Sequence, residues 1–131
     1  MERRKHKRYK APNGAFVVLL LEPHFAKLGQ IIDIGRGGLA FRYTGRQEWS
    51  AGSSELGILF HEQKFHLDRV PFKTVSDFEM ARKTAHSPVA IRRCGVRFVG
   101  LTHEQKFELE HFIRNYTSGE VEKISRNLCD S

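Results

Sequence analysis

Residues 27–43 read KLGQIIDIGRGGLAFRY, in which two apolar segments are separated by a turn that holds three glycines. Each segment has the length and the apolar content of a β-strand, and clustered glycines mark tight turns. The stretch therefore predicts two strands, Lys27–Ile34 and Gly38–Tyr43, joined by a short turn.

Segments of similar length on both sides of this pair also predict strands. Ala15–Leu21 is a continuous apolar run, which suits a strand buried on both faces. Further strands are predicted at Glu55–Phe60, Lys64–Leu67, Phe72–Phe78 and Val89–Val99. In the last of these the apolar positions shift by one residue at Cys94-Gly95, which predicts a β-bulge there.

After the last strand the apolar period changes from two to that of a helix. Thr102 and Gln105 have the spacing of a capping box, in which each side chain bonds the other residue's backbone N–H. A helix from His103 to Tyr116 is predicted, because four apolar residues share one face: Leu109, Phe112, Ile113 and Tyr116.

Six or seven short strands followed by one amphipathic helix predict a mainly β fold, a small antiparallel barrel with the helix packed across an opening. OB-like and SH3-like barrels fit this pattern equally well. We expect a basic arm at 1–12, the barrel and helix at 13–116, and a tail at 117–131 that is frayed or weakly helical.

Composition narrows the class of protein. The chain has 131 residues, 40% of them hydrophobic, which suits one domain with a real core. No apolar run approaches the roughly 20 residues of a membrane span, and no secretory signal follows the basic start. We therefore expect a cytoplasmic protein without a membrane partner. The seven histidines match no metal motif and no nucleophile arrangement is recognisable, so we expect neither a metal site nor an enzyme.

The net charge of +7 is concentrated at the start of the chain. Six of the first ten residues are Lys or Arg and one is Glu, so about +2 remains for the other 121 residues. This distribution indicates that the arm binds anions, and it argues against a nucleic-acid groove along the body. A dense run of cations repels itself, so we expect the arm to be disordered before a ligand arrives.

Two motifs predict the chemistry of the site. Arg4 and Arg8 can present two planar guanidinium groups to phosphate or to a guanine edge. Asp33 places a carboxylate beside closely spaced glycines, where a flat ligand can approach the backbone. Together they predict a site for a guanine nucleotide that carries phosphates.

In order and spacing, these residues resemble the PilZ domain, a bacterial receptor module for the second messenger cyclic di-GMP. The family pattern is Arg-x-x-x-Arg in an N-terminal arm, then Asp/Asn-x-Ser-x-x-Gly in a turn between two barrel strands. Arg4 and Arg8 match the first motif, and Asp33 and Gly38 match the ends of the second, 25 positions after Arg8. Gly35 stands where the family usually has Ser. The similarity covers roughly residues 2–116.

The resemblance implies a six-stranded antiparallel barrel with a C-terminal helix and a flexible basic arm that folds over cyclic di-GMP. Arg4 and Arg8 would contact guanine edges and phosphates, and Asp33 would either accept from a guanine or brace an arginine. Gly38 would permit close backbone approach, and Gly35 would weaken binding without abolishing it. Arg3 and Arg36 are further candidates for ligand contacts, with Arg3 suited to stacking on a second base.

The resemblance implies a signalling adaptor with no cofactor, which acts through a protein partner. Two other interpretations stay open. One keeps the fold but drops the nucleotide, leaving a protein-interaction module, and the absent Ser favours it mildly. The other, a small nucleic-acid-binding barrel, is weaker because the body is nearly neutral.

Overall fold

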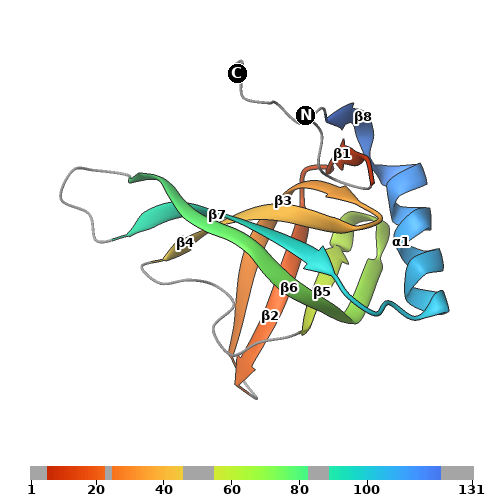
Figure 1. Ribbon diagram of the computed structural model, residues 1–131, viewed down its shortest axis with the longest axis horizontal. Helices are drawn as coiled ribbons and strands as arrows, with labels where there is room; N and C mark the ends of the chain where they lie inside the picture. The colour runs from red at the N-terminus through yellow and green to blue at the C-terminus, as the bar shows by residue number, and fades with distance from the viewer. Residues whose placement is uncertain (1–5, 23–24, 46–54, 83–88, 122–131) are drawn as a thin grey trace.

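The computed structural model describes residues 6–22, 25–45, 55–82 and 89–121 (Figure 1). These residues form strands around a barrel, one short 3-10 helix and one α-helix. The strands are β1 (Arg8–Lys10), β2 (Ala15–Glu22), β3 (Phe25–Gly35), β4 (Gly38–Gly45), β5 (Glu55–Phe60), β6 (Phe65–Arg82), β7 (Ala90–Phe98) and β8 (Ser118–Val121). The short helix is His61–Gln63, and the α-helix, α1, is His103–Tyr116.

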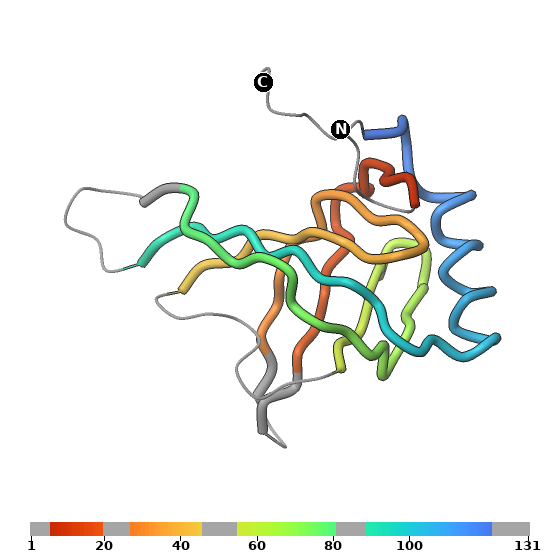
Figure 2. The backbone as a smooth tube through the Cα atoms, viewed as in Figure 1, coloured from red at the N-terminus to blue at the C-terminus, as the bar shows by residue number. Residues whose placement is uncertain are grey.

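Six strands close into an antiparallel barrel in the order β2-β5-β6-β7-β4-β3, and the pairing of β2 with β3 completes the circle. β1 continues along the edge of β3 beyond the end of β2, and β8 pairs with the outer edge of β1. In Figure 2 these two short strands lie side by side near the C-terminal end of α1. The N-terminal arm and the C-terminal segment are thus joined through backbone pairing.

The barrel interior is filled by alternate residues of each strand, as the two-residue period of a strand requires. In β2, for example, Ala15, Val17 and Leu19 are fully buried. The helix α1 lies beside one end of the barrel (Figure 1), where Leu109 and Phe112 are buried. Aromatic rings from β5, β6 and α1 pack together there, namely Phe60, Phe65, Phe112 and Tyr116.

The predicted fold is confirmed, and α1 has the predicted bounds and capping box. Gln105 N–H donates to the Thr102 hydroxyl at 3.0 Å, and Thr102 N–H donates to the Gln105 side chain at 3.0 Å. The described part of the chain holds no helix long and apolar enough to cross a membrane.

Two strand predictions were wrong in detail. Residues 65–67 and 72–78 belong to one long strand, β6, which continues through Arg69 in the left-handed region (φ +57°) and through Pro71. Lys64 lies before it, at the end of the short helix. Ala15–Leu21 is not buried on both faces, because Phe16 and Val18 are only partly covered.

The predicted bulge at Cys94-Gly95 was also misplaced. β7 runs in unbroken register with β4, and the irregularity lies in β6, between Thr74 and Ser76, opposite that segment. Cys94, Val96 and Phe98 all face the interior. The even-numbered residues therefore face the barrel interior along the whole of β7.

Both chain ends are more regular than predicted. The expected frayed or helical tail was wrong for residues 118–121, which form β8. The expected disorder of the arm was wrong for residues 8–10, which form β1 and pair with strands on both sides. Backbone hydrogen bonding holds both segments, since paired strands satisfy polar groups that would otherwise need water.

Candidate functional site

The glycine turn between β3 and β4 is the surface on which the arm lies. Arg8 pairs with Gly35 in the register of β1 and β3. A Cβ atom at position 35 would clash with the carbonyl oxygen of Lys7, and one at position 37 would lie 2.7 Å from the ring of His6. The absence of side chains at 35 and 37 therefore allows the arm's backbone to lie directly on the turn.

Gly38 belongs to the same contact. A Cβ there would clash with the carbonyl oxygen of Val96 and would lie 3.1 Å from Nη2 of Arg8. The N–H of Phe98 donates to the carbonyl of Gly37 at 2.9 Å, which fixes the turn to β7. The turn is thus held between the arm on one side and β7 on the other.

Asp33 is the centre of the site and is the one charged residue that is buried among the described residues, at 3% exposure. Arg8 donates from Nη1 to its Oδ1 at 2.8 Å, and Nη2 of Arg93 lies 3.5 Å from its Oδ2. A buried carboxylate is costly unless it is paired, and here two guanidinium groups from different strands pair with it. The cluster of Arg8, Asp33 and Arg93 therefore carries a net charge of +1.

Arg93 was missed by sequence reasoning. It lies on β7, sixty positions after Asp33, and only the pairing of β4 with β7 brings it to this face. An alternating strand pattern indicates which residues face outward, but it does not indicate the strand beside which they will lie.

A second polar cluster lies on the opposite face of β7 and has a structural role. Arg92 donates from Nε to Oδ1 of Asp77 at 3.0 Å, and the hydroxyl of Tyr43 donates to Oδ2 of Asp77 at 2.7 Å. Burial, and then the hydrogen bond to Asp77, raises the pKa of Tyr43 above its ordinary value of 10.0. The hydrogen bond to Asp77 also raises the pKa of Arg92. This cluster joins β4, β6 and β7.

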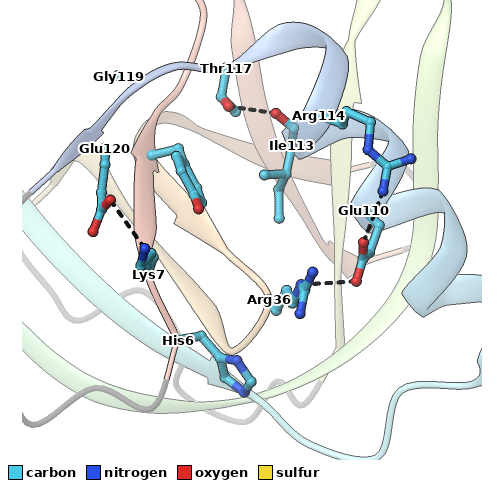
Figure 3. Close-up of a pocket in the computed structure, with 10 residues that line it drawn as sticks. His6, Lys7, Arg36, Glu110, Ile113, Arg114, Thr117, Gly119 and Glu120 are labelled. Atoms are coloured by element: carbon cyan, nitrogen blue, oxygen red, sulfur yellow. Dashed lines mark hydrogen bonds and ion pairs between the residues drawn. The ribbon is translucent and has the colours of Figure 1, made fainter.

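On the far side of β1 from Asp33, an open pocket of about 660 Å³ lies between the arm, the glycine turn, α1 and β8 (Figure 3). Arg36 points into it and pairs through Nε with Glu110 at 2.9 Å. Nζ of Lys7 lies 3.7 Å from the carboxylate of Glu120. Alternation along β1 places Tyr9 on this side and Arg8 on the side of Asp33. Lys7, directly before β1, also lines the pocket.

The structure thus brings together four of the predicted site residues, Arg8, Asp33, Gly35 and Gly38. Arg36 lies apart from them, beside α1. Arg3 and Arg4 lie outside the described residues. Among the described residues, no three His, Cys, Asp or Glu side chains gather as a metal ion would need.

Comparison with known proteins supports one assignment. No curated protein sequence matches the chain. Among solved structures, the fold is similar to YcgR from Escherichia coli in complex with c-di-GMP, with a TM-score of 0.64 and 18% identity over 87% of this chain and 46% of that chain. It is also similar to the PilZ domain of YcgR from Escherichia coli with c-di-GMP, with a TM-score of 0.64 and 14% identity over 88% of this chain and 92% of that chain.

The K. pneumonia MrkH-c-di-GMP complex is similar at a TM-score of 0.68 and 12% identity, over 88% of this chain and 52% of that chain. The chain therefore spans about half the length of the YcgR and MrkH chains. The family model described as PilZ domain matches residues 2–115, nearly the whole chain. On this match, the chain belongs to the PilZ domain family.

Proposed function

We propose that the protein is a receptor for cyclic di-GMP, which it binds where the arm meets the glycine turn. The observation that carries this proposal is the placement of Arg8, which is held by Asp33 at 2.8 Å directly over Gly38. The YcgR and MrkH structures to which the fold is similar are complexes with this nucleotide, which adds support.

The chemistry of the site suits a dianionic guanine nucleotide. Cyclic di-GMP has two phosphates and two guanine bases, and Arg8 offers a planar group of donors that matches either one. A bidentate arginine–guanine pair contributes about 1–3 kcal/mol. By the family motif, Arg4 acts beside Arg8, and Arg3 is a further arginine of the same arm.

In this proposal Asp33 braces arginines rather than accepting from guanine. Both of its oxygens are engaged by guanidinium groups and the residue is buried. A guanine would have to compete with Arg8 and Arg93 for this carboxylate. Fixing the guanidinium group before the ligand arrives lowers the entropy cost of binding.

Gly35 has a different consequence from the one expected from the motif alone. A lost neutral hydroxyl contact costs about 0.5–1.5 kcal/mol, which weakens binding without abolishing it. The glycine also lets the backbone of the arm lie on the turn, because a side chain at this position would clash with Lys7. The docked arm in turn positions Arg8.

Arg36 is not part of the proposed site, because it pairs with Glu110 on the side of α1. We propose a signalling role in the cytoplasm in which the liganded surface contacts a protein partner, with no enzymatic step. The arm and β8 are joined by pairing, so a change at the ligand reaches the C-terminal segment directly.

The test is calorimetric titration with cyclic di-GMP, with GMP and cyclic di-AMP as controls. Micromolar or tighter binding that is selective for the guanine dinucleotide supports a receptor, and the stoichiometry separates one ligand from an intercalated pair. No heat at about 100 µM in a folded sample, a concentration that would detect binding of only about −5.5 kcal/mol, would overturn the proposal and leave the interaction module. Binding with steep salt dependence and no nucleotide preference would favour nucleic acid instead.

A further inference from the structure

The outer face of the sheet formed by β1, β3, β4, β7 and β6 continues well beyond the two motifs. Directly opposed residues of neighbouring strands face the same side, so the register defines rows across this face. The row through Asp33 continues to Ala40, Gly95 and Ser76. It therefore consists of small residues from β4 to β6.

Larger side chains lie on both sides of this row. On one side, the neighbouring row starts at Gly38, which pairs with Arg97 on β7, and Arg97 in turn pairs with Lys73 on β6. On the other side, Arg42 pairs with Arg93 on β7, and Arg93 in turn pairs with Phe78 on β6. The small residues thus form a floor that is bordered by cations and by one aromatic ring.

Exposure fits a surface that is open to a ligand. Phe78 is 49% exposed, although it is a large apolar side chain on a strand. Lys73, Ser76 and Arg97 are exposed, and Gly95 is partly so. Asp33 and Ala40 are each buried, at 3% exposure, so the open part of the floor lies on β7 and β6, two strands about 4.8 Å apart.

We propose that the nucleotide site extends across this floor, with Arg93 as a ligand-binding arginine and Phe78 as a stacking surface for a base. This inference rests on the proposed function and enlarges its site. Arg93 reaches Asp33 with Nη2, and a guanidinium group has five N–H donors, so others are left for phosphate or guanine.

The open part of the floor suits a flat ring, because Gly95 has no side chain and Ser76 has a small one, so the ring can approach the sheet closely. An exposed aromatic side chain beside an arginine is a common platform for a base, and such stacking contributes through both the ring and the cation. Arg97 and Lys73 supply positive charge on the other border, where a phosphate of the same ligand would lie.

The mutational test is titration of Arg93→Ala and Arg93→Lys with cyclic di-GMP. Arg93→Ala removes charge-assisted hydrogen bonds and is expected to weaken binding by roughly 10- to 100-fold. Arg93→Lys keeps the charge but not the planar group of donors, so an intermediate loss is expected. Phe78→Ala is expected to weaken binding by roughly 5- to 100-fold.

Arg114→Ala is the matched control. It removes the same charge from an exposed residue that lines the pocket on the other side of β1 (Figure 3). Its affinity is expected to stay within about threefold, since a distant surface charge acts only through a screened field. Thermal unfolding of each variant identifies any loss of fold.

A second measurement does not depend on a substitution. On addition of cyclic di-GMP to the labelled protein, the backbone amides of Gly95 and Ser76 and the Nε–H of Arg93 are expected to shift in nuclear magnetic resonance spectra. The amides of Thr117 and Gly119, beside the pocket, are expected to shift less.

The outcomes separate this inference from the proposed function. If the unmodified protein binds while Arg93→Ala and Phe78→Ala bind equally well, the extension is wrong and the receptor proposal stands. Loss in Arg114→Ala with no loss in Arg93→Ala would place the ligand in the pocket and overturn the extension. Absence of binding by the unmodified protein would overturn both.

Discussion

Gly35→Ser restores the residue that the PilZ motif usually has, yet the structure predicts that it loosens the arm. The Cβ of any residue at 35 would clash with the carbonyl oxygen of Lys7 and would lie 3.2 Å from Cδ of Arg8. The first of these atoms belongs to the backbone, so no change of rotamer relieves the contact. The arm must shift away from β3.

The size of the effect follows from two opposing terms. Forcing extra atoms into a well-packed position costs about 1–3 kcal/mol. A new hydroxyl contact to the ligand would return about 0.5–1.5 kcal/mol, but only in the liganded protein, so the ligand-free arm keeps the full cost. Since β1 is only three residues long, the cost is expected to appear as local undocking of the arm rather than as unfolding of the barrel.

The assay is hydrogen exchange of the amides in β1 and β8 without ligand. A loss of 1–3 kcal/mol corresponds to roughly 5- to 100-fold faster exchange through local opening. β8 should follow β1, because it is the terminal strand of the sheet and pairs with β1. Exchange in β7 should stay unchanged.

Gly57→Ser is the matched control, since it makes the same substitution in strand β5. A Cβ there would lie 3.5 Å from the nearest atom, the carbonyl oxygen of Leu67, which is an ordinary contact. Unchanged exchange of β1 and β8 in Gly35→Ser, equal to that in Gly57→Ser, would refute the account of how the arm docks.

Three further predictions concern charges around the site and in the core. Asp33→Asn removes the carboxylate charge that Arg8 and Arg93 share and is expected to lower the free energy of unfolding by about 2–3 kcal/mol, measured in urea. No change would show that the carboxylate is not a brace. The pKa of Tyr43 is raised in the folded protein, so its contribution to stability is complete below pH 10.0 and is lost as the pH rises above 10.0. The free energy of unfolding should therefore fall more steeply with pH in the unmodified protein than in Tyr43→Phe. Equal alkaline slopes in the two proteins would contradict this. Arg36→Ala removes an exposed ion pair, so the free energy of unfolding should change by less than about 1 kcal/mol. Its affinity for cyclic di-GMP should change by less than about threefold. A tenfold loss of affinity would show that Arg36 belongs to the site.

Much of the fold could be predicted because its signals are local. The capping pair Thr102 and Gln105 and the helical spacing after it define α1 from sequence alone. The glycine turn between β3 and β4 has a similarly local signal, because three glycines among four residues are typical of a turn.

The errors came from positions where a local pattern had a tertiary cause. Arg69 and Pro71 look like a break, but β6 continues through them while pairing with β5. In β7, Arg92 occupies an inward position that apolar counting misses, because Asp77 and Tyr43 pair with it. Hydrophobic periodicity detects apolar burial and cannot detect a buried ion pair.

The chain ends and Arg93 were missed because their pairing is non-local. β8 is short and polar and has no strand signal of its own. Its partner, β1, lies more than a hundred residues earlier in the chain. The motifs identified Arg8 and Asp33 correctly as neighbours, since the structure joins them at 2.8 Å. Family motifs record such pairs, whereas a residue outside the motif becomes visible only in three dimensions.

The central claim is that Arg8, held by Asp33 on the glycine turn, binds cyclic di-GMP. Its most direct test is calorimetric titration of the unmodified protein and Arg8→Ala in parallel, with Arg114→Ala as the charge control. The account predicts guanine-selective binding that Arg8→Ala weakens by about 10-fold or more and Arg114→Ala leaves nearly unchanged. Equal affinity of Arg8→Ala and the unmodified protein would contradict it.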